Sequence, residues 1–136
     1  MLEGEYFILC TEISDHENGR DLIGLHDIIY APKFPMRQDP LVGAVAFRTK
    51  KALSGQSLML ALSYELNGKE LHSMPIEVKS KAPKGHVVPI VVDLSHAGFP
   101  EAGLYTFKFK ENGKTILSKK LHVMTEKQMI EHARSL

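Results

Sequence analysis

The sequence predicts an all-β protein, an antiparallel β-sandwich of about eight strands that is followed by a short C-terminal helix. Apolar runs of about eight residues alternate with clusters of Gly, Pro and Asn, a short and regular spacing that is typical of sandwiches and barrels. Asn-Gly pairs at 18–19, 67–68 and 112–113 lie between neighbouring runs, and Asn-Gly is the strongest short-range signal for a β-hairpin. The expected strands lie near residues 5–14, 21–31, 41–50, 57–66, 70–79, 87–95, 104–111 and 115–123.

The alternation of apolar and polar residues predicts the register of two hairpins. Loops of three residues, 66–68 and 111–113, would place the apolar side chains of both strands on one face. The first loop would put Leu60 opposite Met74. Gly68 and Gly113 would then take positive φ, as in a type I turn that is followed by a glycine bulge.

The first two expected strands are apolar on both faces. Residues 6–9 are all apolar, and so are most positions between 22 and 30. A strand with one face in solvent would alternate instead. These strands are therefore either buried on both sides or covered on one side by a partner, as at a subunit interface.

Residues 125–136 predict an amphipathic helix, which follows a sandwich domain that spans residues 1–124. Thr125 and Gln128 have the spacing of a capping box. A helix of this length is marginal alone and needs a surface on which to dock. One stripe of the helix carries its apolar residues, Met129, Ile130, Ala133 and Leu136.

Length and charge exclude several classes of function. A chain of 136 residues suits one domain, and its net charge of +1 lacks the basic excess of a dedicated nucleic-acid binder. No apolar segment approaches the roughly 18 residues of a membrane span, and the N-terminus does not resemble a signal peptide. Cys10 is the single cysteine, so no intramolecular disulfide can form. We therefore expect a cytoplasmic protein.

Two segments resemble a known family. The first runs through Ile-Leu-Cys at 8–10, Asn-Gly at 18–19, Leu-Ile-Gly at 22–24 and Tyr-Ala-Pro-Lys-Phe-Pro at 30–35. The second is Phe-Pro-Glu-Ala-Gly-Leu-Tyr-Thr-Phe at 99–107 with the later Asn-Gly turn. Together they resemble an uncharacterised bacterial family of small immunoglobulin-like sandwich proteins, the domain-of-unknown-function family numbered 6941. The resemblance covers residues 5–123 and implies an immunoglobulin-like sandwich with no known activity or ligand, and nothing carries over to the C-terminal helix.

Cys10 and His26 form the one pair of residues that suggests chemistry. None of the seven histidines is followed by a second histidine at a metal-ligand spacing. If the first hairpin loop is residues 17–19, Cys10 falls opposite His26 on one face. Such a pair could bind a metal or form a reactive thiolate. The alternative is a buried thiol beside a hydrogen-bonded imidazole, which is the more common arrangement.

The other charged residues and motifs point to no reaction. The acidic residues are scattered and do not converge on one loop, as a calcium site requires. Lysines on the later strands are typical of residues that prevent aggregation between sheet edges. There is no phosphate-cradling glycine loop, no Gly-x-Ser-x-Gly elbow and no Ser-His-Asp pattern.

We therefore expect a non-enzymatic interaction or assembly module without a cofactor. A homodimer is the commonest closed assembly, and the apolar stripe of the C-terminal helix supplies the candidate interface residues. The alternative is a sandwich that binds a carbohydrate or another small molecule, and a second alternative is a metal- or thiol-dependent enzyme at Cys10 and His26. An exposed aromatic cluster would favour ligand binding, whereas a self-complementary apolar patch would favour assembly.

Overall fold

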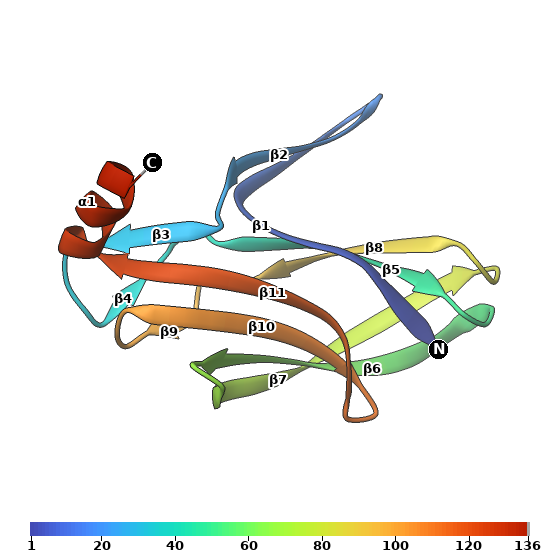
Figure 1. The fold of residues 1–136 in the computed structure, drawn as a ribbon. Helices are drawn as coiled ribbons and strands as arrows, with labels where there is room; N and C mark the ends of the chain where they lie inside the picture. Colours follow the sequence, from blue (N-terminus) through green and yellow to red (C-terminus); the bar gives the residue numbers. More distant parts are fainter. Residues whose placement is uncertain (136) are drawn as a thin grey trace.

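The computed structural model describes residues 1–135 and shows two β-sheets packed face to face, with one hairpin that projects away from them (Figure 1). Sheet A has the strand order β2-β1-β5-β8 and contains β1 (Leu2–His16), β2 (Gly19–Leu25), β5 (Val42–Thr49) and β8 (Val87–Asp93). Sheet B has the order β3-β11-β10-β6-β7 and contains β3 (Ile28–Ala31), β6 (Leu53–Leu66), β7 (Lys69–Ala82), β10 (Gly103–Glu111) and β11 (Lys114–Thr125). The remaining elements are β4 (Met36–Arg37), which pairs with β9 (Gly98–Phe99), and the helix α1 (Glu126–Ser135).

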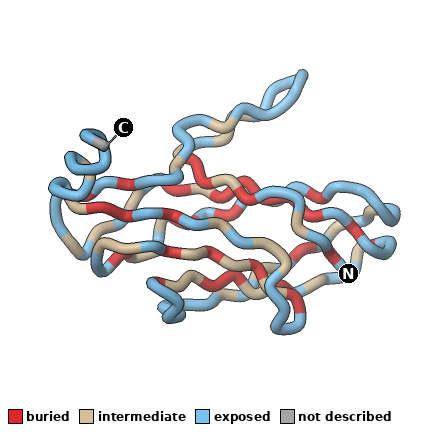
Figure 2. Tube along the Cα trace, viewed as in Figure 1, coloured by how far each residue is buried: buried red, intermediate tan, exposed pale blue. Residues whose placement is uncertain are grey.

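The core lies between the two sheets and is built by every second residue of their strands (Figure 2). Phe7 of β1 packs on Phe109 of β10 with ring centroids 5.2 Å apart, and Phe47 of β5 meets the same ring edge-on at 5.5 Å. Aromatic pairs in this geometry contribute beyond their buried area. These contacts join sheet A to sheet B.

The strand order confirms an immunoglobulin-like sandwich. The strand orders β1-β5-β8 and β11-β10-β6 reproduce the A-B-E and G-F-C neighbours of that fold. The chain crosses between the sheets after β2, β3, β5, β7 and β8. Tyr105, at the start of β10, is fully buried, and its hydroxyl donates a hydrogen bond of 2.6 Å to the carbonyl of Glu101. This is the tyrosine corner of immunoglobulin-like domains, where a tyrosine fixes the corner between two sheets.

The expected strand at 21–31 is two strands in different sheets. β2 pairs with β1 in sheet A, whereas β3 runs parallel to β11 at the edge of sheet B. Gly24 has a φ of 70°, a left-handed conformation that interrupts a regular strand. The carbonyl of Asp27 then accepts the amide of His122 at 3.0 Å, which begins the pairing with β11. The two-residue strands β4 and β9 were also absent from the sequence expectation.

The expected three-residue turns are wrong, although the faces derived from them are right. Asn67 and Gly68 have φ values of 50° and 87°, and Asn112 and Gly113 have 52° and 80°, which identifies two-residue type I′ turns. A bulge then follows within each hairpin and adds one residue to one strand. The bulge restores the expected alternation between core-facing and outward residues. Leu60 lies opposite Ile76 instead of Met74, and Leu60 and Ile76 both remain on the core side.

The two turn glycines should contribute to stability through backbone conformation alone. A Cβ at Gly68 or Gly113 would meet no atom within 4 Å, but both residues have positive φ. We expect Gly68→Ala and Gly113→Ala each to lower the free energy of unfolding by about 1 kcal/mol or more. Gly98→Ala is the matched control, because its Cβ would also meet nothing within 4 Å and its φ lies outside the left-handed region. Equal urea-unfolding midpoints for all three variants would contradict the turn assignment.

Candidate functional site

The side of sheet A that faces away from sheet B is apolar. Phe7, Leu9 and Val45 point into the core, so the residues that alternate with them point outward. Three neighbouring strands thereby place apolar side chains side by side on the exterior, and Leu25 of β2 joins them opposite Cys10. We call this surface the outer face; its residues are Tyr6, Ile8, Cys10, Leu25, Val42, Ala44, Ala46, Pro89 and Val91.

Sheet B shows what an ordinary solvent-facing side looks like in the same molecule. Its outward positions on β6 and β10 include Glu65, Thr106 and Lys108, and the ammonium of Lys108 pairs with the Glu65 carboxylate at 3.0 Å. One face buried and one face polar is the usual pattern of an antiparallel sheet. The outer face of sheet A departs from this pattern.

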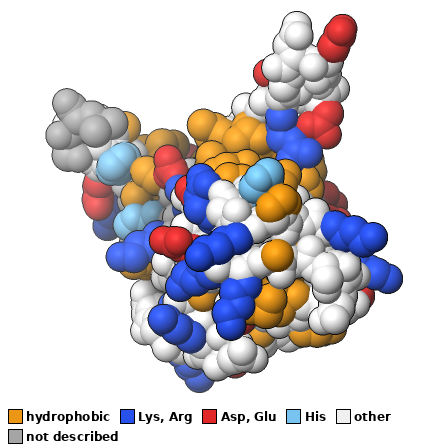
Figure 3. Space-filling model, turned by 90° about the vertical axis from the view of Figure 1, so that its right-hand side faces the viewer, with side chains coloured by type: hydrophobic (Ala, Val, Ile, Leu, Met, Phe, Trp, Pro, Cys, Tyr) orange, Lys and Arg blue, Asp and Glu red, His pale blue; other side chains and the backbone are white. Residues whose placement is uncertain are grey.

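A two-stranded ribbon, residues 11–25, continues sheet A beyond the sandwich (Figure 1). Beyond Cys10, β1 has no partner in β5 and pairs with β2 alone. Most residues of the ribbon are exposed (Figure 2), including Ile23 at 46% and Leu25 at 63%. Hydrophobic side chains gather at the foot of this hairpin (Figure 3).

Polar pairs join the two strands of the ribbon. The Arg20 guanidinium donates to Asp15 at 2.6 Å, and the His16 ring lies 3.2 Å from Asp21. The hydrogen bond from Arg20 holds the pKa of Asp15 below its usual range. Exposed pairs of this kind contribute little stability. An isolated two-stranded hairpin is at best marginally stable in water.

The structure does not bring Cys10 and His26 together. The first turn lies at Glu17 and Asn18, which shifts the register by one residue and places Cys10 opposite Leu25. The His26 ring instead lies 2.9 Å from the hydroxyl of Thr11, and its backbone amide donates to the carbonyl of Leu9. A one-residue shift exchanges the faces of a strand, so Thr11 takes the place that the sequence interpretation gave to Cys10.

Cys10 is fully buried at the foot of the ribbon. Its thiol donates a weak hydrogen bond to the carbonyl of Val42 at 3.7 Å. Burial raises the pKa of this thiol, although the backbone amide of Glu12 acts in the opposite direction. A higher pKa leaves less thiolate, which is the reactive form.

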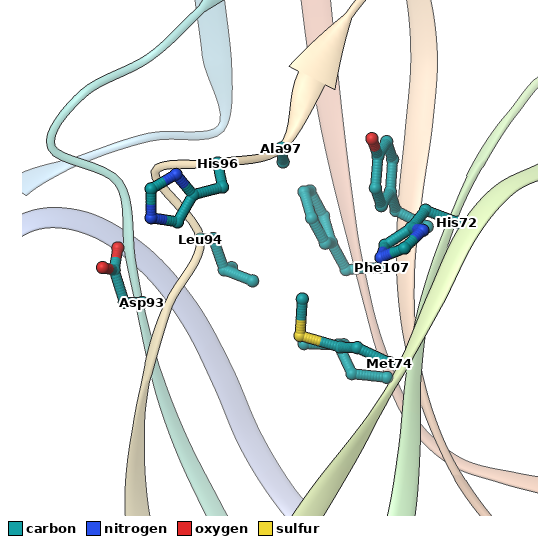
Figure 4. Close-up of a pocket in the computed structure, with 9 residues that line it drawn as sticks. His72, Met74, Asp93, Leu94, His96, Ala97 and Phe107 are labelled. Atoms are coloured by element: carbon teal, nitrogen blue, oxygen red, sulfur yellow. The ribbon is translucent and has the colours of Figure 1, made fainter.

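A small pocket of about 100 Å³ opens between the core side of sheet B and the loop that follows β8. Figure 4 shows His72 and Met74 on one wall and Asp93, Leu94 and His96 on the other. The ring of Tyr64 stacks on Phe107 with centroids 5.6 Å apart. The amide of Ser95 donates to Asp93 at 3.0 Å, and this bond lowers the pKa of the carboxyl group.

Neither a metal centre nor a membrane span is evident in residues 1–135. Within this described part of the chain, His, Cys, Asp and Glu do not gather in groups of three or more that could hold a metal ion. Its helix is also too short and too polar to cross a bilayer.

The C-terminal helix forms with the expected cap but makes few contacts with the sandwich. The Thr125 hydroxyl accepts the amide of Gln128, and the Gln128 side chain accepts the amide of Thr125 in return. Met129 is half-buried, whereas Ile130 and Ala133 are exposed. Leu136, the fourth candidate interface residue, lies outside the described residues.

Sequence reasoning missed most of the outer face. It singled out the first two strands as apolar on both faces, but residues 42–47 and 87–92 are also continuous apolar runs. A continuous run is the signal of a strand that is covered on both sides. The pocket had no such signal, because His72 and His96 come from separate strands and loops.

Cys10 should react slowly with alkylating reagents in the folded protein. Both its complete burial and its raised pKa predict this result. The measurement is the rate of thiol labelling at neutral pH, with and without denaturant. Met59→Cys in a Cys10→Ala background is the control, because Met59 is 57% exposed and a thiol there should label quickly. Labelling of native Cys10 at the rate of that control would restore the reactive-thiol hypothesis.

The chain is similar to a solved structure and matches a family model. Among solved structures, an immunoglobulin-like protein from Pseudomonas aeruginosa is similar, with 10% sequence identity, a TM-score of 0.45, and coverage of 91% of this chain and 97% of that one. No curated protein matches the chain. The model of a family of unknown function, DUF6941, matches residues 5–124. The match includes all strands from β2 to β10 and most of β1 and β11, and the chain therefore belongs to this family.

Proposed function

We propose that this protein is a non-enzymatic interaction and assembly module that works as a homodimer. The observation that carries the proposal is the apolar outer face of sheet A, which runs without interruption onto the exposed Leu25 of the ribbon. The contact surface is the ribbon together with the part of the outer face at its foot.

The extent of the outer face supports this function. Three rows, each across three strands, cover about 14 Å by 20 Å, or about 300 Å², at ordinary strand spacings. Apolar patches of a few hundred square ångströms on a soluble protein commonly mark interaction sites. The ribbon adds the surface of Ile23 and Leu25.

The ribbon supports assembly for a second reason. Within residues 1–135, neither a third strand nor a helix pairs with its strands, and their side-chain pairs are exposed. A partner that paired with the ribbon would supply the missing contacts.

The two alternative functions have weaker support. Small-molecule sites usually enclose about 300–1,000 Å³. The pocket beside His72 and His96 has about 100 Å³, too little for a sugar ring with its substituents. An enzyme built on Cys10 and His26 would need the two side chains in contact, whereas His26 is engaged with Thr11.

Leu25→Lys should weaken the homodimer. The change places a charge on the contact surface, and burial of a leucine side chain is worth about 1.5–3 kcal/mol, which corresponds to an increase of about tenfold to a hundredfold in the dissociation constant. Light scattering across a concentration series measures the change. Met59→Lys is the matched control on the outward side of sheet B, because Met59 and Leu25 are similarly exposed, at 57% and 63%. A wild-type protein that stays monomeric at high concentration, or equal weakening by both variants, would contradict the proposal.

Deletion of residues 126–136 tests whether the dimer interface lies on the ribbon or on the C-terminal helix. Met129 is half-buried against the same chain, whereas Ile130 and Ala133 are exposed and could meet a neighbour. If the ribbon forms the interface, the truncated chain should remain dimeric in light scattering and should lose some thermal stability. A truncated chain that becomes monomeric while Leu25→Lys stays dimeric would place the interface on the helix.

A further inference from the structure

The free edges of the two sheets differ in their ability to pair with another strand. In an antiparallel sheet, the backbone groups of successive residues point alternately to one neighbour and to the other. At an edge strand, every second N–H and C=O therefore points away from the sheet. Such a row is a template for an added strand unless something blocks it.

Two of the long edges are blocked by proline. The amide of Leu94 donates to Leu41, so the even-numbered residues of β8 face β5 and Pro89 occupies an outward position. The amide of Asn67 donates to Leu104, so the even-numbered residues of β6 face β7, and by the same alternation Pro75 occupies an outward position on β7. Proline has no N–H to offer, and an added strand would lose a hydrogen bond at each site.

The edge of β2 carries no such block. The amide of His26 donates to Leu9, so the even-numbered residues of β2 face β1, while the backbone groups of Asp21 and Ile23 point outward. Residues 19–25 contain no proline. The opposite edge of the ribbon, on β1, carries Glu12, Ser14 and His16, and the short strand β3 has four residues. Among the described edges, β2 is the one that combines length, free backbone groups and apolar side chains.

We propose that the β2 strands of two copies of this chain pair antiparallel about a two-fold axis at Ile23, which rests on the assembly function proposed above. This register places Ile23 opposite its own counterpart and Asp21 opposite Leu25. A shift of two residues toward the tip would place Asp21 opposite Asp21, and like charges directly opposite are unfavourable. The two copies then form one hydrogen-bonded strand order, β8-β5-β1-β2-β2-β1-β5-β8.

The distribution of charge indicates that the strand paired with β2 belongs to a second copy of this chain. The ribbon has four acidic residues and Arg20, a net charge of −3, whereas the whole chain has +1, so the remaining residues carry +4. Figure 3 shows many Lys and Arg side chains on the body of the protein below the ribbon. Antiparallel pairing carries the acidic tip of each ribbon toward the basic body of the other copy and keeps the two tips apart.

Pairing and burial have different roles in this dimer. Strand pairing over a few residues sets the orientation but buries far less than the roughly 1,200 Å² of a small specific interface. Further burial comes from Ile23 and Leu25, whose exposed side chains meet the other copy across the paired strands. The dimer therefore uses the free edge of the ribbon and the foot of the outer face at Leu25.

Cysteine cross-linking tests the two-fold axis directly. In a Cys10→Ala background, Ile23→Cys should form a disulfide-linked dimer of twice the chain mass under mild oxidation, because Cα atoms of opposite residues in such a pair lie about 5.5 Å apart. Met59→Cys, which exposes a thiol on the outward side of sheet B, should give little disulfide-linked dimer. A light-scattering dimer that does not cross-link through position 23 would overturn this inference and leave the assembly function standing. A protein that is monomeric throughout would overturn both.

Ile23→Pro provides an independent test of the hydrogen-bonded edge. The substitution removes an outward N–H from the edge of β2, as Pro75 and Pro89 do at the edges of β7 and β8. We expect a monomer whose circular dichroism spectrum matches that of the wild type. We also expect the wild-type dimer to dissociate more readily as salt rises, because the charges involved are exposed. A folded Ile23→Pro variant that remains dimeric would overturn the proposal. If this variant does not fold, the cross-linking experiment at position 23 decides the proposal.

Discussion

Sheet A has apolar side chains on both of its faces, and the other features of this molecule follow from how each face is covered. The inner face is covered by sheet B, through contacts such as Phe7 on Phe109 and Phe47 on Phe109. On the outer face, Ala44 and Ala46 of the central strand are buried between larger neighbours on β1 and β8. Small residues in the middle of a sheet leave a flat surface, which suits the approach of another polypeptide better than it suits water.

The ribbon is an addition to the sandwich and not a part of its core. The amide of His26 donates to Leu9 at 2.8 Å, and the amide of His122 donates to Asp27 at 3.0 Å. The foot of the ribbon is therefore closed, and the chain enters sheet B directly after it. Residues 11–25 supply none of the fully buried large side chains. Their contribution lies in what they present to the outside, which is why the proposed function is assigned to them.

The fold could be predicted from the sequence because its signals are local and repeated. The alternation in residues 58–66 and 104–109 and the three Asn-Gly pairs identify strands and turns without knowledge of distant contacts. The register of the first hairpin could not be predicted, because a turn at residues 17–18 and a loop at 17–19 are both compatible with the same residues. That difference of one position separates Cys10 from His26. In the two later hairpins the bulges compensated for the wrong turn length, so an incorrect loop still gave the correct faces.

If β2 pairs with its own counterpart as proposed, the pattern of blocked edges also limits the size of the assembly. A heterologous contact, in which one patch meets a different patch, leaves a free copy of each patch and can continue into a fibre. The proposed pairing of β2 with its own counterpart uses the same edge in both copies. Of the edges that remain, β3 has four residues, and those on β7 and β8 carry Pro75 and Pro89 at outward positions. No further strand can be added there without the loss of backbone hydrogen bonds. In the proposed dimer, an exposed apolar edge that would otherwise be an aggregation hazard is used in a closed pair, and the prolines on β7 and β8 oppose further growth.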